Sequence, residues 1–190
     1  MGLIFVLRLK ISRNLIRSGA KCCKVGKLMY SQLRCIMLFL GEFEHSLDAK
    51  QRLAVPSEIR NCLPSDGVDA VFVSAPGPNG FLWLWPEKTF EDLSNALGGS
   101  LLGDEGVQNF ERLIFSQSSR CPLDKAGRVR IPDRMLTRYG LSGNIMILGV
   151  RDHLELCTTD KWKEERELLE PAAADIWRRA REAIRNRTSS

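Results

Sequence analysis

Hydrophobic and polar positions follow one pattern twice along the chain, and the second copy begins 76 positions after the first. Each copy reads Leu-Asp, then an Arg four residues after the Asp, then a short aliphatic run that ends at Pro. The copies occupy 47–56 and 123–132. A self-match at a fixed spacing indicates two copies of one structural unit. We therefore expect two similar halves of about 70 residues each.

Each unit is predicted to be a β-hairpin that leads into a short helix. The residues before Asp48 alternate between apolar and polar positions, which is typical of a strand. The Asp is expected to open a tight turn by accepting backbone N–H groups two residues further on. Gly127 suits a left-handed position in the second turn, whereas Gln51 occupies the equivalent position in the first turn and is expected to be strained there. A Pro then opens the helix in each unit, at Pro56 and Pro132.

The remaining periodic segments complete a predicted α+β fold. Further strands are expected at 70–74, 81–85, 144–150 and 153–157, and helices at 86–97 and 107–115. A loop is expected at 75–80. A long helix is predicted from Thr159, interrupted at Pro171 and continued to Arg187. Because two strands alone bury too little apolar surface to be stable, the two units are expected to share one core.

Residues 1–36 differ from the rest of the chain in charge. They contain eight Lys or Arg residues and no acidic residue, which leaves 20 basic against 23 acidic residues, a net charge of −3, for 37–190. Any surface of this part that binds a polyanion must therefore be a local patch. The apolar run at 2–7 is far shorter than the ~18–20 residues that span a bilayer, and the flanks of a signal peptide are missing.

These differences predict a division of the chain into five parts. Residues 1–36 form a basic extension, which we interpret as a start placed upstream of a true start at Met37, or as a disordered segment. A basic extension that binds a membrane surface or DNA is the alternative. The other parts are a first repeat at 37–100, a linker and helix at 101–112, a second repeat at 113–170, and a C-terminal helical tail at 171–190.

The candidate chemistry of the chain lies in the cations of the two predicted turns. An Arg four residues after an Asp can form a structural salt bridge across the turn, or it can bind phosphate or a guanine edge through its planar donor fork. We assign Asp48 and Asp124 to the turn structure. The predicted DNA-binding residues are the basic side chains at or near the turns, namely Lys50, Arg52, Lys125, Arg128 and Arg130.

The sequence contains no motif typical of an enzyme. It has no paired carboxylates, no nucleophilic triad, and no Cys or His residues at the spacing of metal ligands; its six Cys are scattered. We expect no catalytic residue, no metal and no cofactor. Trp83 and Trp85 could stack on bases, but their alternation favours a core or a subunit contact. His153 is interpreted as structural or interfacial.

The repeated Asp-x-x-x-Arg turns, the entry sequence at 41–48 and the closing sequence at 149–156 resemble the MraZ family of bacterial transcription regulators, whose DNA-binding domains are AbrB-like. The resemblance covers about 37–168. It implies two pseudo-symmetric β-hairpin/helix repeats that form a swapped-hairpin β-barrel with peripheral helices and a C-terminal helix. It also implies ring-like homo-oligomers that bind short direct repeats upstream of their own cell-division and cell-wall gene cluster.

Sequence and resemblance together predict a DNA-binding transcription regulator. The expected partners are double-stranded DNA and further copies of the same chain, without a membrane, and the expected location is the cytoplasm at the nucleoid. An assembled ring would present many identical turns, so that avidity strengthens modest contacts. The alternative is a non-catalytic oligomeric module, antitoxin-like or a scaffold, that does not read DNA. The Arg-rich side of the predicted C-terminal helix could follow phosphates, contact another subunit or face solvent.

Overall fold

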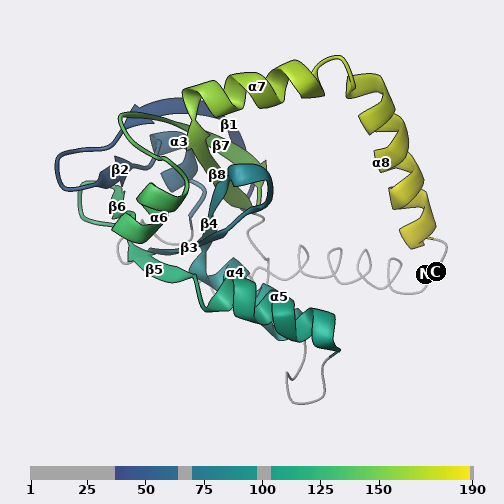
Figure 1. Cartoon of the computed structure of the whole chain (residues 1–190), viewed down its shortest axis with the longest axis horizontal. Coiled ribbons are helices and arrows are strands. Elements are labelled where there is room, and N and C mark those ends of the chain that lie inside the picture. Colours follow the sequence, from purple (N-terminus) through teal and green to yellow (C-terminus); the bar gives the residue numbers. More distant parts are fainter. Residues whose placement is uncertain (1–36, 64–69, 98–103, 189–190) are drawn as a thin grey trace, which may run out of the picture. The chain divides into compact units, whose positions relative to one another are not determined.

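The computed structural model describes residues 37–63, 70–97 and 104–188 (Figure 1). The expectations for residues 1–36, and for the first part of the linker between the repeats (101–103), lie outside the described residues. The described part is a mixed α+β fold built from two matching halves, as predicted. No helix in this part is both long and apolar enough to cross a bilayer.

The strands follow the predicted order closely. They are β1 (Phe39–Ser46), β2 (Arg52–Ala54), β3 (Val71–Pro76), β4 (Leu82–Pro86), β5 (Ser119–Pro122), β6 (Arg128–Arg130), β7 (Asn144–Arg151) and β8 (His153–Thr158). The helical segments are α3 (Ser57–Arg60), η1 (Pro78–Gly80), α4 (Glu87–Ala96), α5 (Glu105–Phe115), α6 (Asp133–Arg138), α7 (Thr159–Leu169) and α8 (Ala173–Thr188).

The two halves exchange strands with each other. In the six-stranded sheet, whose order is β1-β7-β8-β4-β3-β5, the first strand of each half pairs with the third strand of the other. β1 pairs antiparallel with β7 over its whole length, β5 pairs with β3, and β4 lies against β8 at the centre. The sheet is therefore pseudo-symmetric, and neither half can form it alone.

A second, two-stranded sheet joins β2 to β6. Single β-bridges connect it to the large sheet at both edges, between Leu47 and Leu53 and between Leu123 and Val129. The described strands thus form a continuous circuit, although single bridges rather than full ladders complete it. This arrangement agrees with the predicted swapped hairpins.

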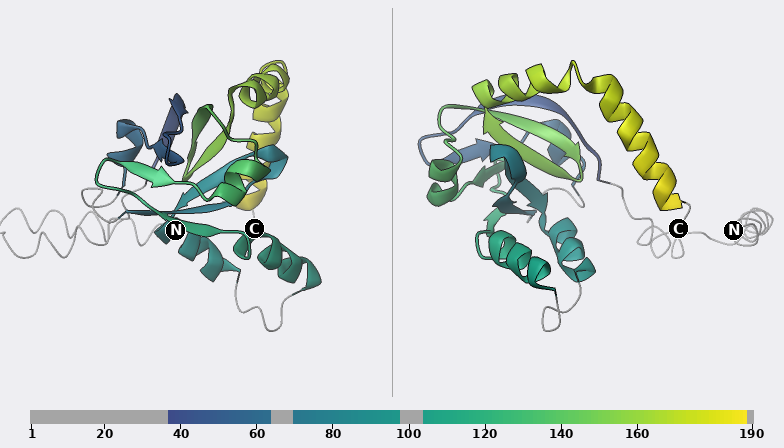
Figure 2. Two further views of the ribbon diagram at one scale, coloured as in Figure 1. Left: turned by 60° about the vertical axis from the view of Figure 1, so that its left-hand side comes forward. Right: turned by 45° about the vertical axis from the view of Figure 1, so that its right-hand side comes forward.

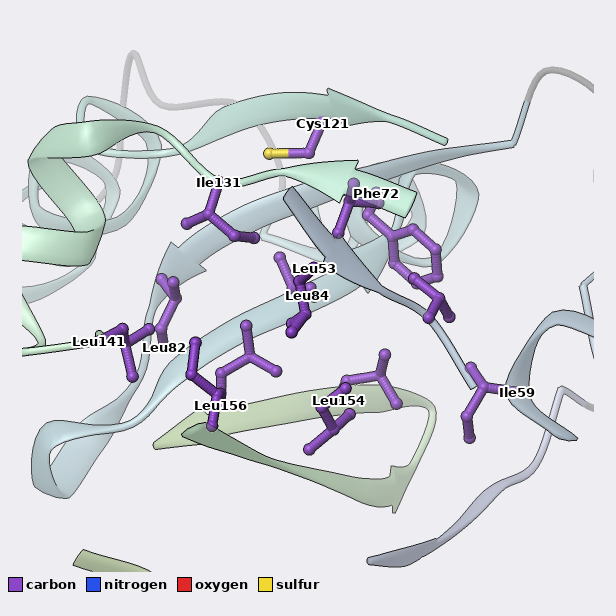
Figure 3. Close-up of a cluster of buried hydrophobic side chains, with 14 of the residues drawn as sticks. Leu53, Ile59, Phe72, Leu82, Leu84, Cys121, Ile131, Leu141, Leu154 and Leu156 are labelled. Atoms are coloured by element: carbon purple, nitrogen blue, oxygen red, sulfur yellow. The ribbon is translucent and has the colours of Figure 1, made fainter. Parts of the chain in front are cut away.

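The main core lies between these sheets and draws on both halves (Figure 3). Leu82 and Leu84 of β4 face Leu154 and Leu156 of β8, and all four are 1% exposed or less. Their alternation along each strand turns the intervening residues to the opposite side of the sheet. Fully burying one such side chain contributes roughly 1.5–3 kcal/mol, so this shared core couples the folding of the two halves.

α4, α5 and α7 lie against the outer side of the large sheet (Figure 2), whereas α3 and α6 contribute Ile59, Met135 and Leu136 to the main core. Phe90 of α4 and Phe115 of α5 meet edge to face, with ring centroids 5.4 Å apart, and pack over Val73 and Ala75 of β3. α7 contacts β7 and β8. The predicted interruption at Pro171 is confirmed, because α7 ends before it and α8 begins after it.

Most predicted strand and helix boundaries agree with the structure to within one residue, and two differ by two residues. α5 begins at Glu105 instead of 107, because Asp104 caps it by accepting the N–H of Gly106 at 2.7 Å. β3 continues through Ala75 and Pro76, which were expected in a loop, because both pair with β4.

Candidate nucleic-acid interface

The two Asp-x-x-x-Arg turns lie side by side because β2 and β6, which follow them, pair antiparallel. Leu53 lies opposite Val129 in this pairing, and both side chains are buried, which anchors the strands in the core. Each turn also accepts a backbone N–H from the other half. Val55 donates to the carbonyl of Gly127 at 2.9 Å, and Ile131 donates to that of Gln51 at 3.3 Å.

The first turn is organised by the carboxylate of Asp48. Its Oδ1 accepts the backbone N–H of Lys50 at 2.8 Å and that of Arg52 at 2.9 Å. Its Oδ2 accepts Nε of Arg52 at 2.8 Å. Gln51 adopts the left-handed conformation, with φ of 58°. The predicted Asp-capped turn and its strained Gln are therefore both confirmed.

The second turn repeats this geometry. Oδ1 of Asp124 accepts the backbone N–H of Ala126 at 2.9 Å and that of Arg128 at 3.0 Å, and Oδ2 accepts Nε of Arg128 at 3.1 Å. Gly127 takes the left-handed position with φ of 74°, where glycine carries no steric cost. The 76-residue repeat in sequence is thus a repeat in three dimensions.

The two turns are linked by ion pairs that cross between the halves. Nη1 of Arg52 lies 3.3 Å from Oδ2 of Asp124, and Nη1 of Arg128 lies 3.7 Å from Oδ2 of Asp48. Two carboxylates and two guanidinium groups therefore form one neutral cluster. Both arginine side chains remain partly exposed, at 27% for Arg52 and 33% for Arg128.

This cluster lowers the pKa of both carboxyl groups. The side-chain hydrogen bond from Arg52, followed by backbone N–H groups, lowers the pKa of Asp48 to about 2. At Asp124, burial raises the pKa, but hydrogen bonds from Arg128 and Ala126 outweigh it and the pKa is lowered. Both carboxylates are consequently ionised at neutral pH and hold the arginines in place.

Three of the predicted cations lie outside this cluster. Lys50 and Lys125 are exposed at the two turns, and neither side chain has a hydrogen bond or an ion pair with any residue of the described ranges. Arg130 is 68% exposed and lies 3.6 Å from Asp133. These three side chains are accessible to solvent.

Sequence reasoning missed a sixth cation, Arg60 of α3. Its Nε donates to the carbonyl of Val55 at 3.1 Å, and its side chain lies over Gly127 of the other half. A Cβ added at Gly127 would come within 2.8 Å of three Arg60 atoms. The repeat could not reveal Arg60, because the equivalent position in the second half is Leu136. We refer to Lys50, Arg52, Arg60, Lys125, Arg128 and Arg130 as the paired-turn surface.

The aromatic residues considered as a base-stacking platform occupy a different place. Trp83 and Trp85 lie on the outer side of β4, half-buried, and Trp85 stacks on His153 with ring centroids 4.2 Å apart. The imidazole lies 2.9 Å from Asp152 and 3.5 Å from Glu155. Burial lowers the pKa of His153, but these two carboxylates outweigh it and the pKa is raised above 6.5. This arrangement is that of a structural cluster.

Comparison with known proteins identifies the family of the chain. The model of the family described as "MraZ protein, putative antitoxin-like" matches residues 38–100 and 114–177. A protein named "Transcriptional regulator MraZ" from Pediococcus pentosaceus is 32% identical over 139 residues, which cover 73% of this chain and 94% of that protein.

Two further relatives carry the same name. The protein from Symbiobacterium thermophilum is 31% identical over 125 residues, with 66% of this chain and 87% of the relative covered. The protein from Clostridium beijerinckii is 32% identical over 130 residues, with 68% and 88% covered. With the family model matched in both halves and these relatives covered almost completely, the chain belongs to the MraZ family.

Proposed function

We propose that this protein is a sequence-specific DNA-binding transcription regulator that acts as a homo-oligomer on direct repeats in a promoter, in the first place that of its own cell-division and cell-wall gene cluster. The role is that of a regulator and not of an enzyme. Relatives that match most of the chain are named transcriptional regulators. The observation that carries the proposal is the paired-turn surface, where the fold gathers cations from both repeats.

Five cations of this surface divide into two groups by their contacts, and the sixth, Arg60, is exposed and donates to the backbone of Val55. Lys50, Lys125 and Arg130 are exposed and supply the first contacts with phosphate and base edges. Arg52 and Arg128 hold the turns in shape through their ion pairs and offer the remaining edge of each guanidinium to the DNA. Long cations on a two-stranded β-ribbon can enter the major groove, where Arg binds guanine through two hydrogen bonds.

A single chain offers few cations, so oligomerisation is central to the proposal. A homo-oligomeric ring repeats the paired-turn surface at a fixed spacing, and DNA with matching repeats binds several copies at once. The second contact is then intramolecular, which raises the overall affinity by roughly 10²–10⁴ without any new interaction. The affinity for DNA should therefore depend on both the number and the spacing of the repeats.

The direct experiment is an electrophoretic shift with the DNA upstream of the protein's own gene, in the presence of excess non-specific competitor. Matched probes carry the tandem repeats, one repeat, or the repeats moved apart by half a helical turn. We expect the tandem probe to bind at least ~100-fold more tightly than the other two. Equal binding to all three probes would contradict repeat recognition.

The second candidate is an oligomeric interaction module that docks a protein and does not read DNA. The occupied guanidinium groups of Arg52 and Arg128 favour it, since each already faces two carboxylates. The same shift experiment separates the two functions. If the protein is an interaction module, none of the three labelled probes shifts in the presence of excess non-specific competitor DNA.

A further inference from the structure

A cavity of about 450 Å³ lies away from the two turns, where three distant segments of the chain meet. The connection between β3 and β4, the end of α6 and the start of α7 form its walls. The lining residues are Gly77, Gly80, Arg138, Tyr139, Thr158 and Lys161. No part of the proposed DNA contact uses them.

The lining carries positive charge without a carboxylate. Arg138 lies with its guanidinium carbon 5.8 Å from the ring centroid of its neighbour Tyr139, and it forms no ion pair with an acidic residue in the described ranges. Lys161 has one ion-pair partner in the described ranges, Glu165, whose Oε2 lies 3.6 Å from Nζ and which is not part of the lining. Two cations thus face a cavity that holds no matching anion.

The backbone at the cavity also favours an anion. Thr158 caps α7, an eleven-residue helix, by accepting the N–H of Lys161 at 3.2 Å, which leaves its hydroxyl proton to donate. The first N–H groups of a helix lack partners within it and carry partial positive charge.

We propose that this cavity binds a phosphate group. Arg138 supplies a planar fork of donors, Lys161 a compact positive charge, and the hydroxyl of Thr158 a neutral hydrogen bond, a combination that fits a tetrahedral oxyanion. The phosphate belongs either to a small free phosphate compound or to the backbone of bound DNA. Both sources would bind through the same contacts. They are distinguished by whether substitutions in the cavity weaken the binding of free phosphate or the binding of DNA.

The test uses the full chain and four variants: Arg138→Gln, Lys161→Gln, the double variant, and Lys163→Gln as control. Lys163 is exposed on the same helix and undergoes the same change of charge as Lys161. The first arm measures binding of inorganic phosphate and pyrophosphate by titration calorimetry, against potassium chloride of equal ionic strength. The second arm measures the affinity for promoter DNA by fluorescence anisotropy.

A site for a free phosphate compound predicts saturable binding in the first arm that weakens about tenfold or more in each single cavity variant, with DNA affinity unchanged. A site for DNA phosphate predicts that the cavity variants lose DNA affinity and that the slope of log affinity against log salt falls by about 0.9. Lys163→Gln should match the wild type in both arms. If neither arm distinguishes the double variant from the control, the proposal is wrong.

Discussion

At the scale of single residues, the Asp48 carboxylate shows how strongly the turns depend on charge. Its pKa is lowered from 3.8 to about 2 in the folded protein. A group whose pKa is depressed by folding stabilises the protein above its unfolded pKa, and this contribution is lost as the pH falls through the folded pKa. The stability contributed by Asp48 is therefore present at pH 5 and disappears between about pH 4 and pH 2.

We predict that Asp48→Asn removes this part of the pH dependence, because an amide does not ionise. Urea unfolding at pH 5 and at pH 2.5 should show a smaller loss of unfolding free energy on acidification in the variant than in the wild type. Asp133→Asn, which changes an exposed carboxyl group in a wider ion pair, is the control and should behave as the wild type. An identical pH dependence in wild type and Asp48→Asn would show that the ion-pair cluster is not formed.

A second residue-scale prediction uses the equivalent positions 51 and 127. Both are left-handed, but one is Gln and the other Gly. The left-handed conformation costs an ordinary residue roughly 1–2 kcal/mol, so Gln51→Gly should stabilise the protein by up to about 1 kcal/mol. Gly127→Ala should destabilise it, because the new Cβ also displaces Arg60 from its bond to Val55.

Urea unfolding midpoints of these two variants provide the measurement. The expected shifts are opposite in sign although the positions are related by the repeat. Shifts of the same sign would mean that the two turns are not equivalent in solution.

At the scale of strands and helices, the exchange between halves depends on the close approach of β1 and β7. Gly149 lies opposite Gly41 in that pairing. A Cβ added at Gly149 would lie 2.6 Å from the backbone nitrogen of Leu40, and backbone cannot move aside as a side chain can.

We therefore predict that Gly149→Ala destabilises the protein by about 2 kcal/mol or more, whereas Ala54→Gly, a strand substitution that creates no such clash, costs about 1 kcal/mol or less. Amide hydrogen exchange should show lost protection in both β1 and β7 for Gly149→Ala. A variant with wild-type stability and protection would argue against this pairing.

Most strands and helices could be predicted because each is specified by the residue pattern within its own segment. Alternation placed Leu82 and Leu84 on one side of β4 and the two Trp residues on the other, and the repeat predicted both Asp turns. The pairing of β1 with β7 involves residues about 100 positions apart, and no local pattern specifies it. For the same reason, the ion pairs between Arg52 and Asp124, and the position of Arg60 over Gly127, needed the three-dimensional structure.

At the scale of the whole molecule, residues 37–190 carry a net charge of −3, so the protein body does not attract DNA as a whole. The strand exchange compensates by placing the cations of both repeats on one surface. A basic residue in one turn therefore lies close to the basic residues of the other turn, although 76 positions separate the two turns in sequence. Affinity should depend on this local patch and on salt, and little on the total charge of the chain.

The most direct test is the affinity for promoter DNA as a function of salt, measured by fluorescence anisotropy for two triple variants of equal charge. The first, Lys50→Ala/Lys125→Ala/Arg130→Ala, removes the three exposed cations that the sequence predicted for the paired-turn surface. The second, Lys88→Ala/Arg112→Ala/Lys163→Ala, removes exposed cations on α4, α5 and α7.

We predict that the first variant loses at least ~100-fold in affinity and that its salt dependence falls by about 0.9 in log–log slope for each phosphate contact removed, while the second stays within about threefold of the wild type. Size-exclusion chromatography should give the same oligomer for all three proteins. If the two triple variants bound DNA equally well, with equal salt dependence, the paired turns would not be the DNA-binding surface.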